Sequence, residues 1–596
     1  MPDRCRSWLT LLVAAVMAST GLAGCAKVPD NGPAVPVAVP GLDQSSEPED
    51  SHVNAVLPHP EEGADPHVSV AAYLNALQGT RNPGQLDVFL SNSVRPTFDQ
   101  SPQVVIVKDI RTTVGGVVGA NTTALFTGRL VGALDAEGVF DDGGGRAWQA
   151  QVRMVRVRGI WVFADPPPLI LDETQFNDDF TALNVYFSAK PSAVTGTDPE
   201  LVIPERRYVN SDLTPSTPTQ VVDFVLAGPS DALSRVARNP LPKIKRTSRV
   251  SVTGGDLVIE LEPEAESASV DALNDFVAEV GWSLTDRFSG RVKLLVGGRP
   301  LDVAGFTASQ PPSMWKRYNP STLDDLLPNY LVQKGAVKRT ADIPGVQRRG
   351  PRLESSTVTK GVHTAAISFD LNRLAVVRND PAGGQRLWIA DASGTLQPTL
   401  RAPVIGRPSW GGSSSTVVVP VGGKLFQVGV GNADHPTQVE VFGDGKRLLD
   451  ITTVRLSLDE TRALVIAGSG ANSRLYFGTL TGTGSGGALI MTSRQLAVDG
   501  SPRDISWWGP VTAAVAVVVP VSNGVSVALV PIDGAPDRVQ TTSKPDANPI
   551  RLAADPSTAQ QGGLPIQIGD RLYRLAISGP LEPQASAGGE APFFPG

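Results

Sequence analysis

Cysteine is scarce in this chain, whose 596 residues include only Cys5 and Cys25. Charged residues make up 19% and hydrophobic residues 41%, a balance that excludes a disordered polyelectrolyte. No segment after Cys25 offers the roughly 18 uninterrupted apolar residues that a membrane-spanning helix needs. The net charge of -7 lacks the basic excess of proteins that bind the phosphate backbone. Nucleic acid is therefore not an expected partner.

Recognisable catalytic and metal-binding motifs are missing as well. The chain contains no G-x-S-x-G, no H-E-x-x-H and no EF-hand loop. His52, His59 and His67 are too scattered for a compact metal site, and neither His363 nor His435 has an identifiable acid or nucleophile nearby in the sequence. We therefore expect no catalytic residue, no metal and no cofactor, and we expect that the protein is not an enzyme.

The amino terminus has the order of an export signal. Arg4 and Arg6 precede a mostly apolar stretch from Trp8 to Ala18, and Leu22-Ala23-Gly24-Cys25 follows. This tetrapeptide resembles the bacterial lipobox, which implies cleavage before Cys25 and its modification with S-diacylglycerol and N-palmitoyl groups. We predict a signal peptide over 1–24 and a lipid anchor on Cys25, which would hold the protein on the cell membrane, facing outside the cytoplasm. A chance cysteine behind an ordinary signal peptide is the alternative.

Residues 25–66 are rich in Pro, Ser, Glu and Asp without sustained periodicity, which predicts a disordered stalk. Residues 67–172 then predict an α+β unit with two helices followed by a curved sheet. A slip in the alternation at Met154-Val155 indicates a bulge or a buried edge there. The ending GIWVFADPPP makes the unit resemble the NTF2-like fold. The first helix is predicted from an apolar face formed by Val70, Leu74 and Leu77.

A second α+β unit is predicted over 181–303. Its long helix is indicated by an apolar stripe at Val270, Leu273, Val277, Val280 and Leu284. The segments LNVYF, VVDFVLAGP and VKLLVGGRPL resemble the GerMN module, and this resemblance implies an interaction domain without catalytic activity.

A basic cluster lies within this second unit. It either forms a solvated face or contacts an anionic wall polymer or a partner. The segment 304–351 that follows the unit is predicted to be a linker with some packing. The cluster consists of Lys243, Lys245, Arg246 and Arg249.

The C-terminal part of the chain shows a weak repeat of about 40–50 residues, which is the length of a four-stranded propeller blade. Successive units begin near Ser368, Ser409, Ser457 and Ser506, with a degenerate one near Asp555. We predict an all-β propeller over 352–580 with five visible blades and a disordered tail over 581–596. A sixth blade from about 353 to 359, with the chain's end closing the ring, stays open. The serine and aspartate at each start are expected to satisfy tight turns.

The fold class is thus multidomain, with an NTF2-like α+β unit, a GerMN-like α+β unit and a C-terminal β-propeller. A lipobox, a stalk and these three units in this order resemble the LpqB-type lipoproteins of high-GC Gram-positive bacteria. The resemblance implies a non-catalytic accessory of the MtrAB two-component system, in which the lipoprotein associates with the extracytoplasmic domain of the sensor histidine kinase MtrB and influences cell-envelope homeostasis and division. Of the family's functional residues, the resemblance carries over only Cys25.

Two alternatives of other classes remain open at this point. One is a receptor for a cell-wall glycan or muropeptide that uses the mouth of the propeller. The other is a propeller hydrolase or lyase, although the blades show no set of nucleophile, base and orienting residue.

Overall fold

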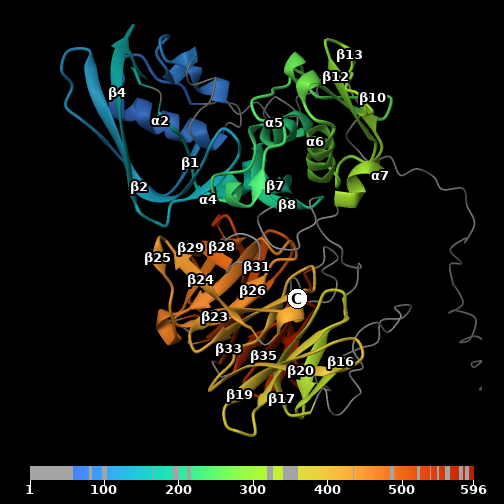
Figure 1. Cartoon of the computed structure of the whole chain (residues 1–596). Helices are drawn as coiled ribbons and strands as arrows, with labels where there is room; N and C mark the ends of the chain where they lie inside the picture. Colours follow the sequence, from blue (N-terminus) through green and yellow to red (C-terminus); the bar gives the residue numbers. More distant parts are fainter. Residues whose placement is uncertain are drawn as a thin grey trace, which may run out of the picture. The chain divides into compact units, whose positions relative to one another are not determined.

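The computed structural model describes residues 58–79, 83–96, 104–165, 167–191, 200–210, 217–318, 327–339, 360–433, 435–482, 489–519, 524–536, 538–545, 549–556, 564–575, 581–583 and 589–596. The described residues all belong to one unit of the chain. Figure 1 shows their helices and strands, coloured along the sequence. The predicted signal peptide, Cys25 and most of the predicted stalk lie outside the described residues. No described helix has the length and apolar character needed to cross a membrane.

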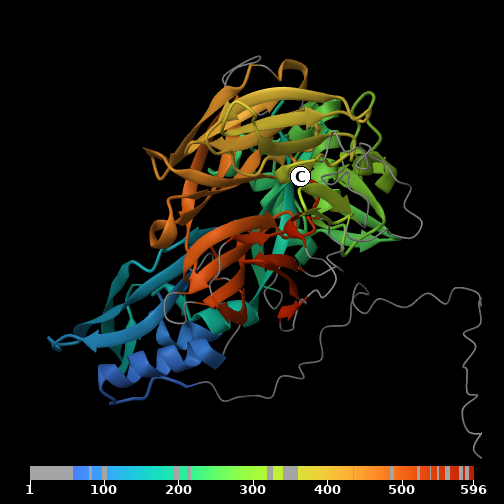
Figure 2. The ribbon, with the colours of Figure 1, turned by 90° about the horizontal axis from the view of Figure 1, so that it is seen from below.

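The first α+β unit places α2 (Pro66–Gly79) and the short 3-10 helix η1 (Pro83–Phe89) against a strongly curved sheet. Figure 2 shows α2, in blue, lying along this sheet. The strand order is β5-β4-β2-β1-β6, and β3 pairs with β2. The strands are β1 (Val104–Val114), β2 (Asn121–Leu134), β3 (Phe140–Asp142), β4 (Ala147–Val157), β5 (Ile160–Phe163) and β6 (Leu169–Leu171).

The buried face of α2 differs in one position from the predicted stripe. Val70 and Leu77 are buried as expected, but Leu74 is only partly buried and Tyr73 is fully buried instead. The predicted stripe contained only aliphatic residues and therefore did not include Tyr73, whose side chain carries a polar hydroxyl. That hydroxyl donates a hydrogen bond of 3.1 Å to the carbonyl of Pro168, so the ring can be buried without an unpaired donor.

The prediction of a bulge or a buried edge at Met154-Val155 is wrong, because β4 lies between β5 and β2 and is not an edge strand. The pairing of β4 with β2 runs without interruption through these residues, and the same holds for its pairing with β5. The register shifts lie instead in the pairing of β1 with β2, between Ile106 and Val107 and between Lys108 and Arg111, where Asp109 adopts φ 55°. The slip in the alternation has another cause, since Val155 lies half-buried on the opposite face of the sheet.

The second α+β unit has two small sheets with helices packed on them. The first sheet has the order β8-β7-β9, and the second has the order β10-β11-β12-β13 with β14 beside β12. A strand from 202 to 210 was not anticipated from the sequence. The elements are α4 (Glu173–Asp179), β7 (Phe180–Ala189), β8 (Val202–Asn210), α5 (Thr217–Ala227), η2 (Leu233–Arg235), β9 (Ala237–Arg238), β10 (Ser251–Thr253), β11 (Asp256–Leu261), η3 (Pro263–Ser267), α6 (Val270–Ser283), β12 (Arg291–Val296), β13 (Arg299–Pro300) and β14 (Ser309–Gln310).

Helix α6 is buried far beyond its predicted stripe. From Asp275 to Gly281 every side chain or glycine is buried, because α5 and β7 cover one flank and α7 (Pro312–Trp315) covers another. Gly281 leaves room for the Trp315 ring, which a Cβ would approach to 2.7 Å. The Trp282 indole N–H donates a hydrogen bond of 2.8 Å to the Trp315 carbonyl. The start of the predicted linker, with η4 (Lys316–Tyr318), therefore belongs to the core of this unit.

The C-terminal part consists of mainly antiparallel sheets that pack side by side, as expected for a propeller. The described residues form five of them: one of three strands, three of four strands and one of nine strands. The nine-stranded sheet joins two four-stranded units through the parallel pairing of β24 with β29. The strands are β15 (Tyr330–Gln333), β16 (Ala336–Arg339), β17 (Val362–Ile367), β18 (Leu374–Asn379), β19 (Gln385–Ala390), β20 (Leu396–Ala402), β21 (Ser409–Trp410), β22 (Thr416–Val421), β23 (Lys424–Gly429), η5 (Val430–Asn432), β24 (Thr437–Gly443), β25 (Lys446–Arg447), β26 (Ile451–Leu456), β27 (Arg462–Ala467), η6 (Gly470–Asn472), β28 (Arg474–Gly482), β29 (Leu489–Leu496), β30 (Ser501–Trp507), β31 (Thr512–Val519), β32 (Gly524–Pro531), β33 (Arg538–Pro545), β34 (Ile550–Leu552), β35 (Leu564–Ile568), β36 (Arg571–Leu575), β37 (Leu581–Pro583) and β38 (Glu590–Phe593).

The three-stranded sheet closes the ring with strands from both ends of this part of the chain. Strand β38 pairs with β15, which pairs with β16, and β38 contacts β17 on one side and β34 on the other. The predicted linker and the predicted disordered tail thus both contain strands. Residues 353–359, where a sixth blade was considered, lie outside the described residues. The predicted fold class of two α+β units and a propeller-like domain is confirmed.

The repeated serines occupy the ends of the innermost strands. The Ser457 hydroxyl donates to the carboxylate of Asp459 at 2.8 Å and accepts from the backbone N–H of Arg462, so the pair satisfies the turn as expected. Ser409 and Ser506 do more, because each bonds backbone at or next to another innermost strand, β26 and β34 respectively. The Ser409 hydroxyl accepts the backbone N–H of Leu456 at 2.9 Å. The Ser506 hydroxyl accepts the backbone N–H of Ala554 at 3.0 Å.

Candidate functional site

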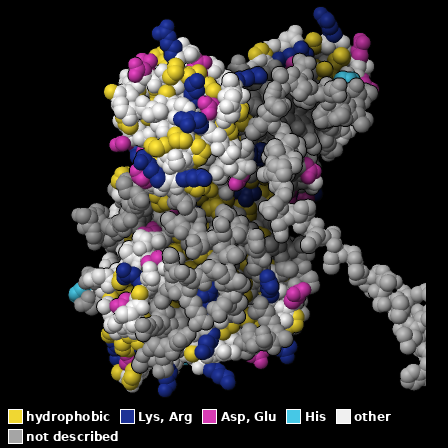
Figure 3. All heavy atoms as spheres, turned by 90° about the vertical axis from the view of Figure 1, so that its right-hand side faces the viewer, with side chains coloured by type: hydrophobic (Ala, Val, Ile, Leu, Met, Phe, Trp, Pro, Cys, Tyr) yellow, Lys and Arg dark blue, Asp and Glu magenta, His cyan; other side chains and the backbone are white. Residues whose placement is uncertain are grey.

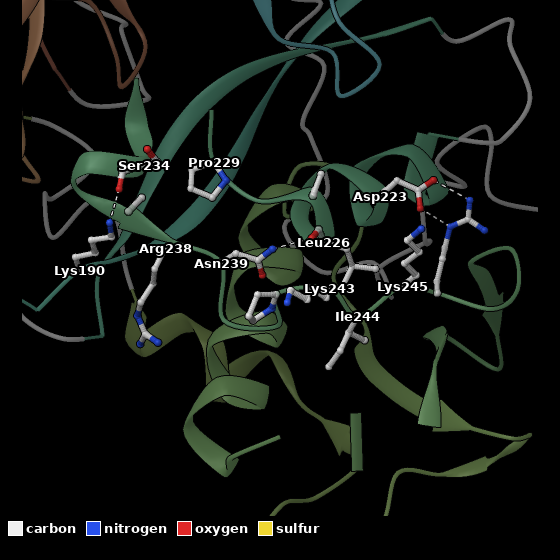
Figure 4. Close-up of a pocket in the computed structure, with 14 residues that line it drawn as sticks. Lys190, Asp223, Leu226, Pro229, Ser234, Arg238, Asn239, Lys243, Ile244 and Lys245 are labelled. Carbon is white, nitrogen blue, oxygen red and sulfur yellow. Dashed lines mark hydrogen bonds and ion pairs between the residues drawn. The ribbon is translucent and has the colours of Figure 1, made fainter. Parts of the chain in front are cut away.

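The second α+β unit contains an open pocket of about 860 Å³ (Figure 4). It lies between the end of α5, the segment of η2 and β9, and the loop that follows β9. Its volume is within the range of pockets that take organic ligands. The lining residues are Lys190, Asp223, Leu226, Ala227, Pro229, Ser234, Ala237, Arg238, Asn239, Pro242, Lys243, Ile244, Lys245 and Arg246.

The local sequence explains how the pocket is held open. Helix α5 ends at Ala227, and Gly228 follows with φ 93°, a backbone conformation that other residues rarely adopt. The Asn239 side chain then joins the two walls. Its amide donates 2.7 Å to the carbonyl of Leu226 at the helix end, and its oxygen accepts the backbone N–H of Leu241 at 2.9 Å. These bonds fix the loop after β9 beside the end of α5.

Five of the lining residues are cationic and one is acidic. Arg246 is neutralised, since its guanidinium forms a bidentate pair with Asp223 at 2.6 and 2.7 Å. Arg238 is paired with Asp275 behind the pocket wall. Lys190 donates to the carbonyl of Ser234, a neutral partner that leaves its charge uncompensated.

Lys243 and Lys245 are exposed at the rim, and among the described residues neither ammonium group has an ion pair or a hydrogen bond. Lys243 also has φ 72°, in the left-handed region. For a residue with a Cβ this conformation costs on the order of 1–3 kcal/mol, and such positions cluster at binding sites. The rim of the pocket therefore offers positive charge that the fold itself does not use.

The wall behind Arg238 contains a fully buried carboxyl group. Glu279 on α6 is 0% exposed, and one of its oxygens accepts the backbone N–H of Ser188 at 2.7 Å. Its other oxygen has no hydrogen-bond partner. Burial raises the pKa of Glu279 well above its ordinary value, and the nearby Asp275 adds to this effect, while Ser188 and Arg238 oppose it.

This raised pKa predicts a stability profile. The folded state favours protonated Glu279, so its contribution is fully present below the unfolded-state pKa of about 4.3 and is lost as pH rises through the raised folded-state pKa. Glu279→Gln cannot titrate and should flatten this fall. Thermal unfolding, followed from about pH 4, near the ordinary pKa of glutamate, up to about pH 9, checks the result. The exposed Glu264→Gln serves as control and should leave the profile unchanged; a Glu279→Gln profile as steep as the unchanged protein's contradicts the assignment.

The predicted basic cluster is brought together only in part. Lys243, Lys245 and Arg246 line the pocket, whereas Arg249 is exposed and does not belong to the lining. Figure 3, which looks at the right-hand side of Figure 1, shows basic side chains next to hydrophobic ones on the surface. The sequence pattern could not reveal that Lys190 joins the cluster, because about fifty residues separate it from Lys243.

Other predicted positions do not gather into a site. Cys25 and His52 lie outside the described residues. His59 and His67 lie near the start of the described chain, and the His363 ring bonds the Asn379 side chain at 2.7 Å. No group of three or more potential metal ligands occurs among the residues that the structure describes.

The two other domains contain an aromatic core and a small cavity at the inner strand ends, and the propeller also has a surface pocket of about 480 Å³ beside Lys334 and Asp570. Beneath the curved sheet, the ring of Tyr73 lies within 5.0–6.5 Å of Phe89, Phe126 and Phe163, measured between ring centroids. At the inner ends of the propeller strands, a cavity of about 20 Å³ lies beside Arg407 and Arg455. That volume accommodates about one water molecule.

The propeller interior holds a charged cluster that sequence reasoning missed. Asp504 on β30 accepts from Arg455 at 3.2 Å, lies 3.6 Å from Arg407, and accepts the backbone N–H of Leu552 at 2.8 Å. Burial, and next the charge of Arg455, lower the pKa of Arg407. The only available sequence signal was the occurrence of charged residues beside otherwise apolar innermost strands.

Three sequence families match successive parts of the chain. Residues 59–177 match the family described as "Lipoprotein LpqB, N-terminal domain", and residues 184–302 match "Sporulation and spore germination". Residues 338–562 match "Lipoprotein LpqB beta-propeller domain". The pocket lies within the second of these matches.

Curated relatives share the same name. The chain is 27% identical over 377 residues to "Lipoprotein LpqB" of Corynebacterium jeikeium, an alignment that spans 60% of each chain. It is 24% identical over 601 residues to "Lipoprotein LpqB" of Mycobacterium paratuberculosis, with 94% of each chain covered. Among solved structures, TolB from Acinetobacter baumannii is similar with a TM-score of 0.34 and 14% identity, covering 47% of this chain and 70% of that one.

Proposed function

We propose a function that proceeds from one premise, that this chain belongs to the LpqB family of lipoproteins. The protein is a membrane-anchored, non-catalytic accessory of a sensor histidine kinase of the MtrB type. In this role it associates with the extracytoplasmic domain of the kinase and acts in cell-envelope homeostasis and division. The observation that carries the proposal is the order of the parts, in which a lipobox at Cys25 precedes three folded domains.

The described domains support a role in binding. The first unit has a core filled by aromatic rings, and the propeller interior is held by buried ion pairs. The pocket of the second unit presents lysines and apolar side chains, which suit the binding of an anionic group. A receptor for a cell-wall glycan or muropeptide at the propeller mouth is the alternative, and the cavity found beside Arg407 at the inner strand ends is small, at about 20 Å³.

Lipidation of Cys25 supplies the test of the anchored role. Two acyl chains hold a protein stably on a membrane, and in this proposal they supply the attachment. We expect Cys25→Ala protein to leave the membrane fraction and to reduce phosphorylation of the kinase's response regulator. Fractionation, together with phosphate-affinity gels of the regulator, measures both effects.

The matched control is Cys5→Ala, which changes the other cysteine of the chain within the predicted signal peptide. This variant should behave like the unchanged protein. If Cys25→Ala protein stays on membranes and supports normal signalling, the anchored accessory role is wrong. Chemical crosslinking on native membranes then tests the partner itself, with a covalent product containing the kinase as the expected result.

A further inference from the structure

The pocket beside α5 carries more positive charge than the fold neutralises. Asp223 compensates Arg246 and Asp275 compensates Arg238, while Lys190, Lys243 and Lys245 remain without an acidic partner among the described residues. Like charges gathered at a partly apolar pocket repel one another, and a bound anion relieves this repulsion. The charge balance therefore points to an anionic ligand.

The rest of the lining restricts the class of that ligand. The pocket walls contribute aliphatic and proline side chains, from Leu226, Pro229, Pro242 and Ile244, and none of the lining residues is aromatic. Nucleobases are commonly recognised by stacking on aromatic rings. A lining of lysines and aliphatic groups instead suits carboxylate side chains mixed with apolar ones.

A sheet edge lies at the same place. Strand β9 pairs with β7 and is the last strand in the order β8-β7-β9, so its outer side is not paired with another described strand. Both residues of β9, Ala237 and Arg238, line the pocket. An unpaired strand edge can offer backbone hydrogen-bonding groups to a ligand, but Ala237 is 1% exposed, so only the half-buried Arg238 of this strand is accessible there.

We propose that this pocket binds an acidic peptide segment of a partner protein. The carboxylates of the segment lie against Lys243 and Lys245, and its apolar side chains contact Leu226 and Ile244. Lys243 lies at the rim with a left-handed backbone, and the hydrogen bond from the Asn239 side chain to the Leu226 carbonyl fixes the adjoining loop. The identity of the segment as part of a protein partner rests on the proposed accessory function.

The test uses the full lipidated chain in detergent and a fluorescein-labelled peptide of alternating glutamate and leucine. We expect fluorescence anisotropy to show binding that weakens with added salt, and no comparable binding of the same peptide with glutamine in place of glutamate. The double variant Lys243→Glu/Lys245→Glu should bind the acidic peptide at least about tenfold more weakly. Binding that the glutamine peptide reproduces would contradict the proposal.

The control variant Lys316→Glu/Lys338→Glu makes the same change in net charge at two exposed lysines outside the pocket and should bind normally. An equal loss in this control would mean that net charge, and not the pocket, controls binding. The variant Lys243→Gly tests whether weaker binding could result from misfolding, because glycine adopts φ 72° without strain. It should be at least as heat-stable as the unchanged protein and still bind more weakly.

A second probe in the same assay, poly(glycerol phosphate), distinguishes a carboxylate ligand from a phosphate ligand. Lysine-dependent binding of this polymer without binding of the acidic peptide overturns the proposal in favour of a phosphate-bearing glycan or lipid. The assay contains no kinase, so its failure is independent of the accessory role. Loss of kinase crosslinking despite normal peptide binding would instead contradict only the proposed function.

Discussion

Asp504→Ala will destabilise the propeller by about 3–5 kcal/mol, the range measured when one partner of a buried ion pair is removed. Asp504 is 2% exposed and lies between the guanidinium groups of Arg455 and Arg407. Removing its carboxylate leaves these cations in the interior without a counter-charge. It also removes the acceptor of the Leu552 N–H, which links β30 to β34.

This loss is measured by hydrogen exchange of the propeller amides and by differential scanning calorimetry. The strands β26, β30 and β34 should exchange faster, and the corresponding unfolding transition should move to lower temperature. Asp570→Ala, at an exposed aspartate between β35 and β36, is the matched control and should shift the transition by less than about 0.5 kcal/mol. A small effect of Asp504→Ala would show that the arginines are neutralised in another way.

Tyr73→Ala will destabilise the first α+β unit by a similar amount, about 3–5 kcal/mol, as is typical when a buried aromatic side chain is truncated. Tyr73 is 0% exposed and contacts Phe89, Phe126 and Phe163 with edge-on ring geometry. Its truncation would open a cavity where α2 meets the sheet. The surrounding rings belong to different elements and cannot all move in to fill it.

Tyr73→Phe separates the ring from the hydroxyl. This variant keeps the packing and loses only the 3.1 Å hydrogen bond to the Pro168 carbonyl, so we expect a loss of about 0.5–1.5 kcal/mol. Chemical denaturation followed by near-ultraviolet circular dichroism distinguishes the two variants. If Tyr73→Phe cost as much as Tyr73→Ala, the hydrogen bond and not the ring packing would hold the helix in place.

Local patterns predicted the regular parts of this fold well. The apolar stripe from Val270 to Leu284 predicted α6, because one face of a helix recurs every 3.6 residues. The repeated serines predicted the inner strand ends of the propeller for a similar reason, since each blade needs the same tight turn. The bulge placed at Met154 was wrong because local alternation does not show the register between strands, which depends on the partner strand.

The amino-acid sequence by itself determined the order of the parts, the helical and strand periodicities, and the similarity to LpqB-type lipoproteins, and it predicted the lipid anchor at Cys25. Only the tertiary structure decided that β38 closes the ring with β15, that Asp504 neutralises Arg455, and that Lys190 joins Lys243 and Lys245 at one pocket. The physical reason is the same in each case. These contacts join residues that are far apart in the chain, and short-range periodicity carries no record of which distant groups share a buried or charged environment.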